Sequence, residues 1–170
     1  MSKDPFFSVQ EATFELLRRL GLTTIFGNLG STELPFLKNF PSDFQYILAL
    51  QEASAVAMAD AFAQATGKLA LVNLHTFAGT GNGMGNINGA YMNKAPLIIL
   101  GGQQTREMLV GDVYLTNVEE TTLPKPWVKW SYQPVRAEDV PAAIMRAYAV
   151  ALQPPAGPGL SAKIAGLGSV

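Results

Sequence analysis

The stretch FQYILALQEASAVAMADAFAQATGKLALVNL, residues 44–74, carries the pattern that decides the fold. An apolar run at 44–50 is typical of a strand, an alanine-rich run at 52–66 ends at Gly67 as a helix does, and 69–74 is a second apolar run. Strands that alternate with helices in this way predict a parallel sheet, because parallel strands need a crossover connection. Strands that are apolar throughout indicate helices on both faces of the sheet.

The same alternation continues on both sides of this stretch. Ser8 and Glu11 form a capping box before a helical pattern that ends at Gly21, and short apolar runs at 23–26 and 96–102 read as further strands. We therefore predict a single α/β domain in three layers, with a parallel sheet between helices. The other expected elements are a short helix at 33–40, a glycine-dense loop at 75–86, a helix at 87–94, a strand at 127–133 and a helix at 137–152.

The composition excludes several classes of function. The chain has 170 residues, of which 48% are hydrophobic and 15% are charged, and its formal net charge is −1. Because it contains no cysteine and a single histidine, we predict no disulfide and no metal site. The near-neutral charge gives no electrostatic basis for binding nucleic acid or a membrane surface. No apolar run reaches the roughly 20 residues of a membrane span and no secretory signal is evident, so we expect a soluble, cytoplasmic chain.

Three polar features follow predicted strands. The turn GNLGS, residues 27–31, follows the first strand, Glu52 follows the second, and His75 follows the third with a glycine-rich segment behind it. In parallel α/β sheets, ligands bind at the carboxyl ends of the strands. This convergence predicts a functional site that contains all three features.

Each feature also has a purely structural interpretation. GNLGS can serve only as a turn, with Ser31 as a helix cap, and His75 can be a structural hydrogen-bonding residue rather than a proton carrier. Glu52 is either a helix-start carboxylate, whose charge the helix dipole favours, or a buried acid, whose charge desolvation disfavours. The segment GTGNGMG, residues 79–85, lacks the third glycine of Gly-x-Gly-x-x-Gly. We therefore favour a close-packed loop over nucleotide binding for that segment.

Four long blocks of the sequence resemble one known family. They are GNLGSTELPFLKNFP at 27–41, YILALQEASAVAMADAFAQATG at 46–67, LVNLHTFAGTGNGMGNINGAYMNKAPLIILGGQQT at 71–105 and LTNVEETTLPKPWVKWSY at 115–132. Together they look like the N-terminal, pyrimidine-binding domain of the thiamine-diphosphate-dependent decarboxylases, in particular the benzoylformate decarboxylases. The resemblance gives a domain over residues 1–158 and a divergent C-terminal tail at 159–170.

The resemblance implies a six-stranded parallel sheet, thiamine diphosphate as cofactor and a 2-oxo acid as substrate. In that family a glutamate after the second strand, here Glu52, bonds the pyrimidine nitrogen N1′ and holds a proton there. His75 matches a histidine that shuttles protons near the substrate, and Ser31 matches a serine that bonds the substrate carboxylate. Asn28 and Gly30 match the turn that approaches the cofactor. Leu29 stands where the close relatives have proline, so this turn is expected to be less rigid.

The family's other two domains have no counterpart in this sequence. The Gly-Asp-Gly motif of the diphosphate-binding domain does not occur, so the magnesium site is expected outside this chain, and the middle domain is absent as well. The expected partner is a second copy in a homo-oligomer or a chain that carries a diphosphate-binding domain. We expect the isolated chain to be inactive. The alternative is a non-catalytic, truncated paralogue or partner module that associates with full-length relatives.

Overall fold

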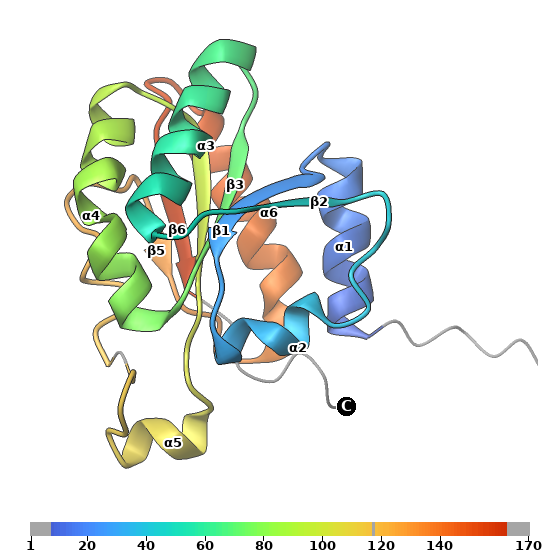
Figure 1. The fold of residues 1–170 in the computed structure, drawn as a ribbon, viewed down its shortest axis with the longest axis vertical. Coiled ribbons are helices and arrows are strands. Elements are labelled where there is room, and N and C mark those ends of the chain that lie inside the picture. The colour runs from blue at the N-terminus through green and yellow to red at the C-terminus, as the bar shows by residue number, and fades with distance from the viewer. Residues whose placement is uncertain (1–7, 117, 163–170) are drawn as a thin grey trace, which may run out of the picture.

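The computed structural model describes residues 8–116 and 118–162, and a six-stranded parallel sheet forms its centre (Figure 1). The strand order is β2-β1-β3-β4-β6-β5, and every neighbouring pair is parallel. The prediction of a parallel α/β sheet is therefore confirmed. The strands are β1 Thr24–Asn28, β2 Gln45–Leu48, β3 Ala70–Leu74, β4 Leu97–Gly101, β5 Ser131–Tyr132 and β6 Gly159–Ala162.

Helices cover both faces of the sheet, as the apolar strands predict (Figure 1). Within the described residues, none of the helices is both long and apolar enough to cross a membrane. The α-helices are α1 Val9–Arg19, α2 Leu34–Leu37, α3 Glu52–Thr66, α4 Thr76–Met92, α5 Arg106–Val110 and α6 Val140–Leu152. Short 3-10 turns, η1 at Ser31–Glu33 and η2 at Ala137–Asp139, precede α2 and α6.

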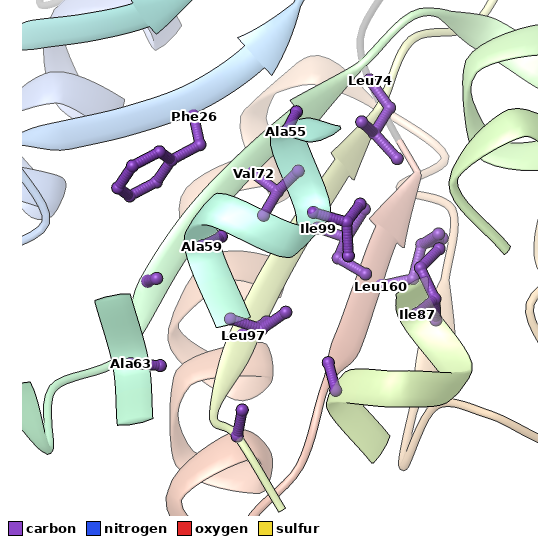
Figure 2. Packing of buried hydrophobic residues seen from close by; sticks show 14 of the residues in the cluster. Phe26, Ala55, Ala59, Ala63, Val72, Leu74, Ile87, Leu97, Ile99 and Leu160 are labelled. Atoms are coloured by element: carbon purple, nitrogen blue, oxygen red, sulfur yellow. The ribbon is translucent and has the colours of Figure 1, made fainter. Parts of the chain in front are cut away.

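Alternate residues of each interior strand enter two separate cores. In β3, Val72 packs in the core beneath α3 and α4, whereas its neighbour Leu71 packs in the core beneath α1 and α6. Figure 2 shows the first of these cores, where Ala55 and Ala59 of α3 lie over the strands. Small alanines let α3 approach the sheet closely, which explains the alanine-rich sequence between two strands.

The strand order reverses between β1 and β3, and this reversal positions the site. From β1 the chain moves outward to the edge strand β2, and from β3 it moves toward β4 on the other side. Asn28 at the end of β1 is in register with Leu74 at the end of β3, so His75, the residue before α4, lies beside the end of β1. Ligands of open parallel sheets bind at such switch points.

Residues 75–86 were expected to form a glycine-dense loop, and this prediction is wrong because Thr76–Met92 form the continuous helix α4. Two of the glycines, Gly79 and Gly83, are sites of close packing. A Cβ on Gly79 would lie 3.2 Å from Glu52 Cγ, and one on Gly83 would lie 3.3 Å from both Leu74 Cδ1 and Val56 Cγ2. Tertiary packing against α3 therefore outweighs the low helix propensity of glycine.

Two other segments differ from expectation. The strand expected at 127–133 is reduced to Ser131–Tyr132. The run at 44–50 forms an edge strand, and Leu50 beyond it is 91% exposed, although its apolar sequence favours burial. The tail at 159–170 begins with β6, which pairs with both β4 and β5; residues 163–170 lie outside the described part of the chain, and the divergence of the tail from the family stays a prediction.

Replacing Gly81 and Gly85 with alanine is expected to stabilise the protein. Both glycines lie within α4, and a Cβ at either position meets no atom within 4 Å. Alanine lowers the entropy of the unfolded chain and costs no contact, so each change should raise the free energy of unfolding by about 0.5–1 kcal/mol. Urea unfolding of the double variant checks this. A lowered unfolding free energy would contradict a helix at these positions.

Candidate functional site

The predicted site residues come together at the carboxyl edge of β1, β2 and β3. Asn28 ends β1, Glu52 begins α3 shortly after β2, and His75 is the residue before α4. Their side chains form two hydrogen-bonded groups, one around Glu52 and one around His75.

Glu52 is held by two asparagine side chains. Its Oε1 accepts a hydrogen bond from Asn28 Nδ2 at 3.1 Å, and its Oε2 accepts one from Asn82 Nδ2 at 3.3 Å. The residue is 8% exposed and is also the first residue of α3. The two alternatives for Glu52, helix-start carboxylate and buried acid, therefore describe the same side chain. Amide donors and the helix dipole stabilise its charge, and burial opposes it.

His75 is anchored by a second buried acid, Glu33. The Nδ1 atom of His75 lies 2.8 Å from Glu33 Oε2 and 3.2 Å from the hydroxyl of Thr32. The same Oε2 accepts the backbone N–H of Gly30 at 2.7 Å, and the Thr32 hydroxyl donates to Oε1 at 2.5 Å. His75 is therefore the exposed end of an ordered network whose interior is a carboxylate.

Two glycines make room for this network. A Cβ on Gly30 would lie 2.3 Å from His75 Nδ1, and one on Gly102 would lie 1.6 Å from Glu33 Oε1. No larger residue fits either position without moving the side chains of the network. The glycine in the predicted turn 27–31 thus serves close packing against His75.

The buried charge of Glu33 also affects Tyr46 on β2. The phenol donates to Asn73 Oδ1 at 3.1 Å. Burial, followed by the negative charge of Glu33, raises the pKa of Tyr46 above its ordinary value. Tyr46 is therefore a neutral hydrogen-bond donor over the physiological range and is not a proton carrier.

Ser31 is exposed and does not cap a helix. It is the first residue of η1, and the cap position belongs to Gly30. In the described structure, no hydrogen bond joins Ser31 to Glu52 or His75, although it lies next in sequence to Thr32 of the network. Its hydroxyl is open to solvent at the edge where the two acids lie.

The sequence analysis missed Glu33, Thr32 and Asn82. Glu33 was expected to begin the short helix at 33–40, and Thr32 lies between that helix and the turn at 27–31. The contact of both residues with His75 spans more than 40 residues of chain. Asn82 was placed in a loop, whereas its position on α4 brings it to Glu52 on α3. Predicting a helix over residues 76–92 would have allowed Asn82 to be identified as a partner of Glu52.

Three exposed apolar side chains follow the ends of β1, β2 and β3, where the site residues also lie. Leu29 after β1 is 37% exposed, Leu50 after β2 is 91% exposed, and Phe77 in the first turn of α4 is 48% exposed. A buried carboxyl beside exposed apolar groups fits a planar heterocycle, which needs one polar contact to a ring nitrogen and apolar cover for its faces. Among residues 8–116 and 118–162, no group of three or more His, Cys, Asp or Glu side chains is arranged to hold a metal ion.

Comparison with known proteins finds one matching family model and several similar proteins. The family model described as "Thiamine pyrophosphate enzyme, N-terminal TPP binding domain" matches residues 7–123. Benzoylformate decarboxylase of Pseudomonas aeruginosa is 54% identical over 151 residues, which make up 89% of this chain and 29% of that protein.

Two solved structures have the same fold over most of the chain. Benzoylformate decarboxylase from Polynucleobacter necessarius superposes with a TM-score of 0.90 at 60% identity, covering 92% of this chain and 29% of that one. The thiamine diphosphate-dependent 4-hydroxybenzoylformate decarboxylase of Rhodococcus jostii RHA1 gives a TM-score of 0.89 at 48% identity, covering 92% and 30%. The chain thus spans about 30% of the length of these relatives.

Proposed function

Because the chain belongs to the thiamine pyrophosphate enzyme family, as an N-terminal TPP binding domain, we propose that it is the pyrimidine-binding part of a 2-oxo acid decarboxylase. The observation that carries this proposal is the buried carboxyl of Glu52, oriented by Asn28 and Asn82 at the switch point of the sheet. The names of the relatives support a benzoylformate-like substrate, a 2-oxo acid with an aromatic group.

The side chains divide the chemistry between them. When bound, thiamine diphosphate supplies a thiazolium ring that accepts the electron pair released as carbon dioxide leaves a 2-oxo acid. Glu52 holds a proton at the pyrimidine nitrogen, and its two asparagine partners keep the carboxyl from rotating. Asn28 and Gly30 border the cofactor at the end of β1, and burial of the acid keeps water from competing for its proton.

The second group acts on the substrate in this proposal. His75, with its ring partly exposed, moves a proton to or from the substrate, and Ser31 donates a hydrogen bond to the substrate carboxylate. The exposure of Ser31 supports this role because its hydroxyl is available to a ligand. A hydroxyl that already made a hydrogen bond within the protein would not be available to the substrate.

The proposal includes a partner that binds the diphosphate and magnesium. That partner is a chain with a diphosphate-binding domain, located with it in the cytoplasm; a second copy of this chain in a homo-oligomer is the other proposed partner. Large apolar side chains exposed on the surface support association. They include Leu48, Leu50, Val110, Tyr114 and Val118. Mixing the chain with a diphosphate-domain protein and measuring carbon dioxide release from benzoylformate tests the function. Association without any release would favour the non-catalytic partner module.

The chain alone is expected to bind thiamine diphosphate weakly or not detectably. Most of the affinity for this cofactor should come from its charged diphosphate and the magnesium ion, which need carboxylate ligands and cationic or backbone donors. The contacts proposed between Glu52 and the pyrimidine ring should supply only a small part of the affinity for thiamine diphosphate. Titration calorimetry with magnesium present measures this directly. Micromolar binding by the pure chain would mean that it holds the diphosphate itself.

A further inference from the structure

We propose that Glu33 is a positioning residue that fixes the tautomer of His75. In this arrangement Nδ1 carries the proton and donates to Glu33, and Nε2 is the nitrogen left to exchange protons. The hydrogen-bond pattern around the two residues, described above, carries the inference. The role of Nε2 in catalysis rests on the proposed function, whereas the tautomer itself does not.

Every neighbour of Nδ1 requires it to be a donor. Glu33 Oε2 lies 2.8 Å from Nδ1 and accepts the N–H of Gly30 at 2.7 Å, and as a carboxylate oxygen it can only accept. The Thr32 hydroxyl donates its one hydrogen to Glu33 Oε1. Its oxygen, 3.2 Å from Nδ1 of His75, can therefore only accept a hydrogen bond from that nitrogen. A hydrogen on Nδ1 satisfies both neighbours, and a lone pair there would satisfy neither.

Close packing prevents the network from relaxing to another arrangement. Glu33 is 4% exposed. Gly102 lies so close to Glu33 Oε1, and Gly30 so close to the His75 ring, that neither position has room for a Cβ. The acid therefore cannot turn away from the imidazole without displacing backbone, and the imidazole cannot move toward the turn at 27–31. Glu33 and His75 are held as a unit although they are far apart in sequence.

The other ring nitrogen remains available. In the described part of the chain, Nε2 of His75 has no hydrogen-bond partner, and the side chain is 17% exposed while that of Glu33 is 3% exposed. An anchored Nδ1–H with an open Nε2 is the arrangement of an imidazole that accepts a proton and returns it. Glu33 touches neither substrate nor cofactor in this scheme, and it acts only through His75.

His75 is the single histidine of the chain, so its ring nitrogens can be observed without ambiguity. We would label the full chain with ¹⁵N, without any cofactor, at a pH high enough to keep the ring neutral. Long-range ¹⁵N–¹H correlation spectra then give the ratio of Nδ1–H to Nε2–H forms. Wild-type protein should show predominantly Nδ1–H. In Glu33→Ala the ratio should fall at least about tenfold, because a hydrogen bond to a charged group is lost.

Two further variants separate positioning from general structure. Glu33→Gln keeps an acceptor oxygen and should retain more of the Nδ1–H form than Glu33→Ala. Glu52→Gln alters the other buried acid and should leave the ratio unchanged. A wild-type ring that is mainly Nε2–H would overturn the proposal, as would equal ratios in wild type and folded Glu33→Ala. If Glu33→Ala does not fold, the ratio of Nδ1–H to Nε2–H forms in wild-type protein and in Glu33→Gln still tests the proposal. Because no cofactor is present, failure of the decarboxylase proposal would not alter these spectra.

Discussion

Glu52→Gln is expected to reduce carbon dioxide release about 10²–10⁴-fold in the mixture with a diphosphate-domain protein, the range typical of losing a general acid–base group. The carboxamide is nearly the same size and can still accept the hydrogen bond of Asn28, so the fold should be retained. It cannot hold an exchangeable acid proton at the pyrimidine nitrogen. The loss should appear in kcat, with little change in the far-ultraviolet circular dichroism of the chain.

Asp60→Asn is the matched control for this variant. Asp60 lies on the same helix, α3, and its carboxylate accepts hydrogen bonds from Gln64 and Asn93 at a distance from the helix start. Its amide variant should release carbon dioxide at the wild-type rate. If Glu52→Gln lowered the rate less than about tenfold, or if Asp60→Asn lowered it equally, the assignment of Glu52 as proton holder would fail.

Gly27→Ala is expected to lower the free energy of unfolding by about 3 kcal/mol or more, near or beyond the upper end of typical overpacking costs. Gly27 lies in β1 between β2 and β3. An added Cβ would be 2.2 Å from the Tyr46 hydroxyl and 2.6 Å from the carbonyl oxygen of Asn73. The phenol could move by giving up its hydrogen bond, but the carbonyl belongs to the backbone of an interior strand. Urea unfolding monitored by tryptophan fluorescence measures the change.

Gly159→Ala provides the comparison within the same sheet. Gly159 is in β6, and a Cβ there would have its nearest neighbours at 3.8 Å, an ordinary van der Waals distance. Alanine should be neutral at this position or stabilise by roughly 0.5 kcal/mol, because it reduces the entropy of the unfolded chain. Equal losses at Gly27 and Gly159 would indicate that strand glycines are needed generally, and that the contact with Asn73 is not the cause.

The sequence was most informative where local pattern and burial agree. The helix predicted at 52–66 is observed at Glu52–Thr66, because an alanine-rich helix between two apolar strands satisfies propensity and packing together. The first part of α4 was predicted as a loop because its sequence is rich in glycine, and packing against α3 explains two of these glycines, Gly79 and Gly83. Helical pattern alone contains no information about such a partner.

The residues of the candidate site were likewise predictable only where the local sequence pattern carried the information. Strand-end reasoning identified the turn at 27–31, Glu52 and His75, since the ends of parallel strands must meet at one edge. It could not find Glu33, whose only local signal is that of a residue at the start of a helix. Its importance comes from burial beside His75, which depends on the order of strands in the sheet and on the shape of the turn at 27–31.

The edge position of β2 has a consequence for how the two halves of the site move. β2 pairs only with β1, whereas β3 is hydrogen-bonded on both sides. Local opening of β2 requires the loss of one ladder, so its amide hydrogens should exchange with solvent sooner than those of β3. Glu52 follows the strand that opens first, and His75 follows one that opens last. A ligand that contacts both Glu52 and His75 would restrict the motion of the edge strand β2 relative to the interior strand β3. The conformational entropy lost on ordering β2 would oppose binding of that ligand.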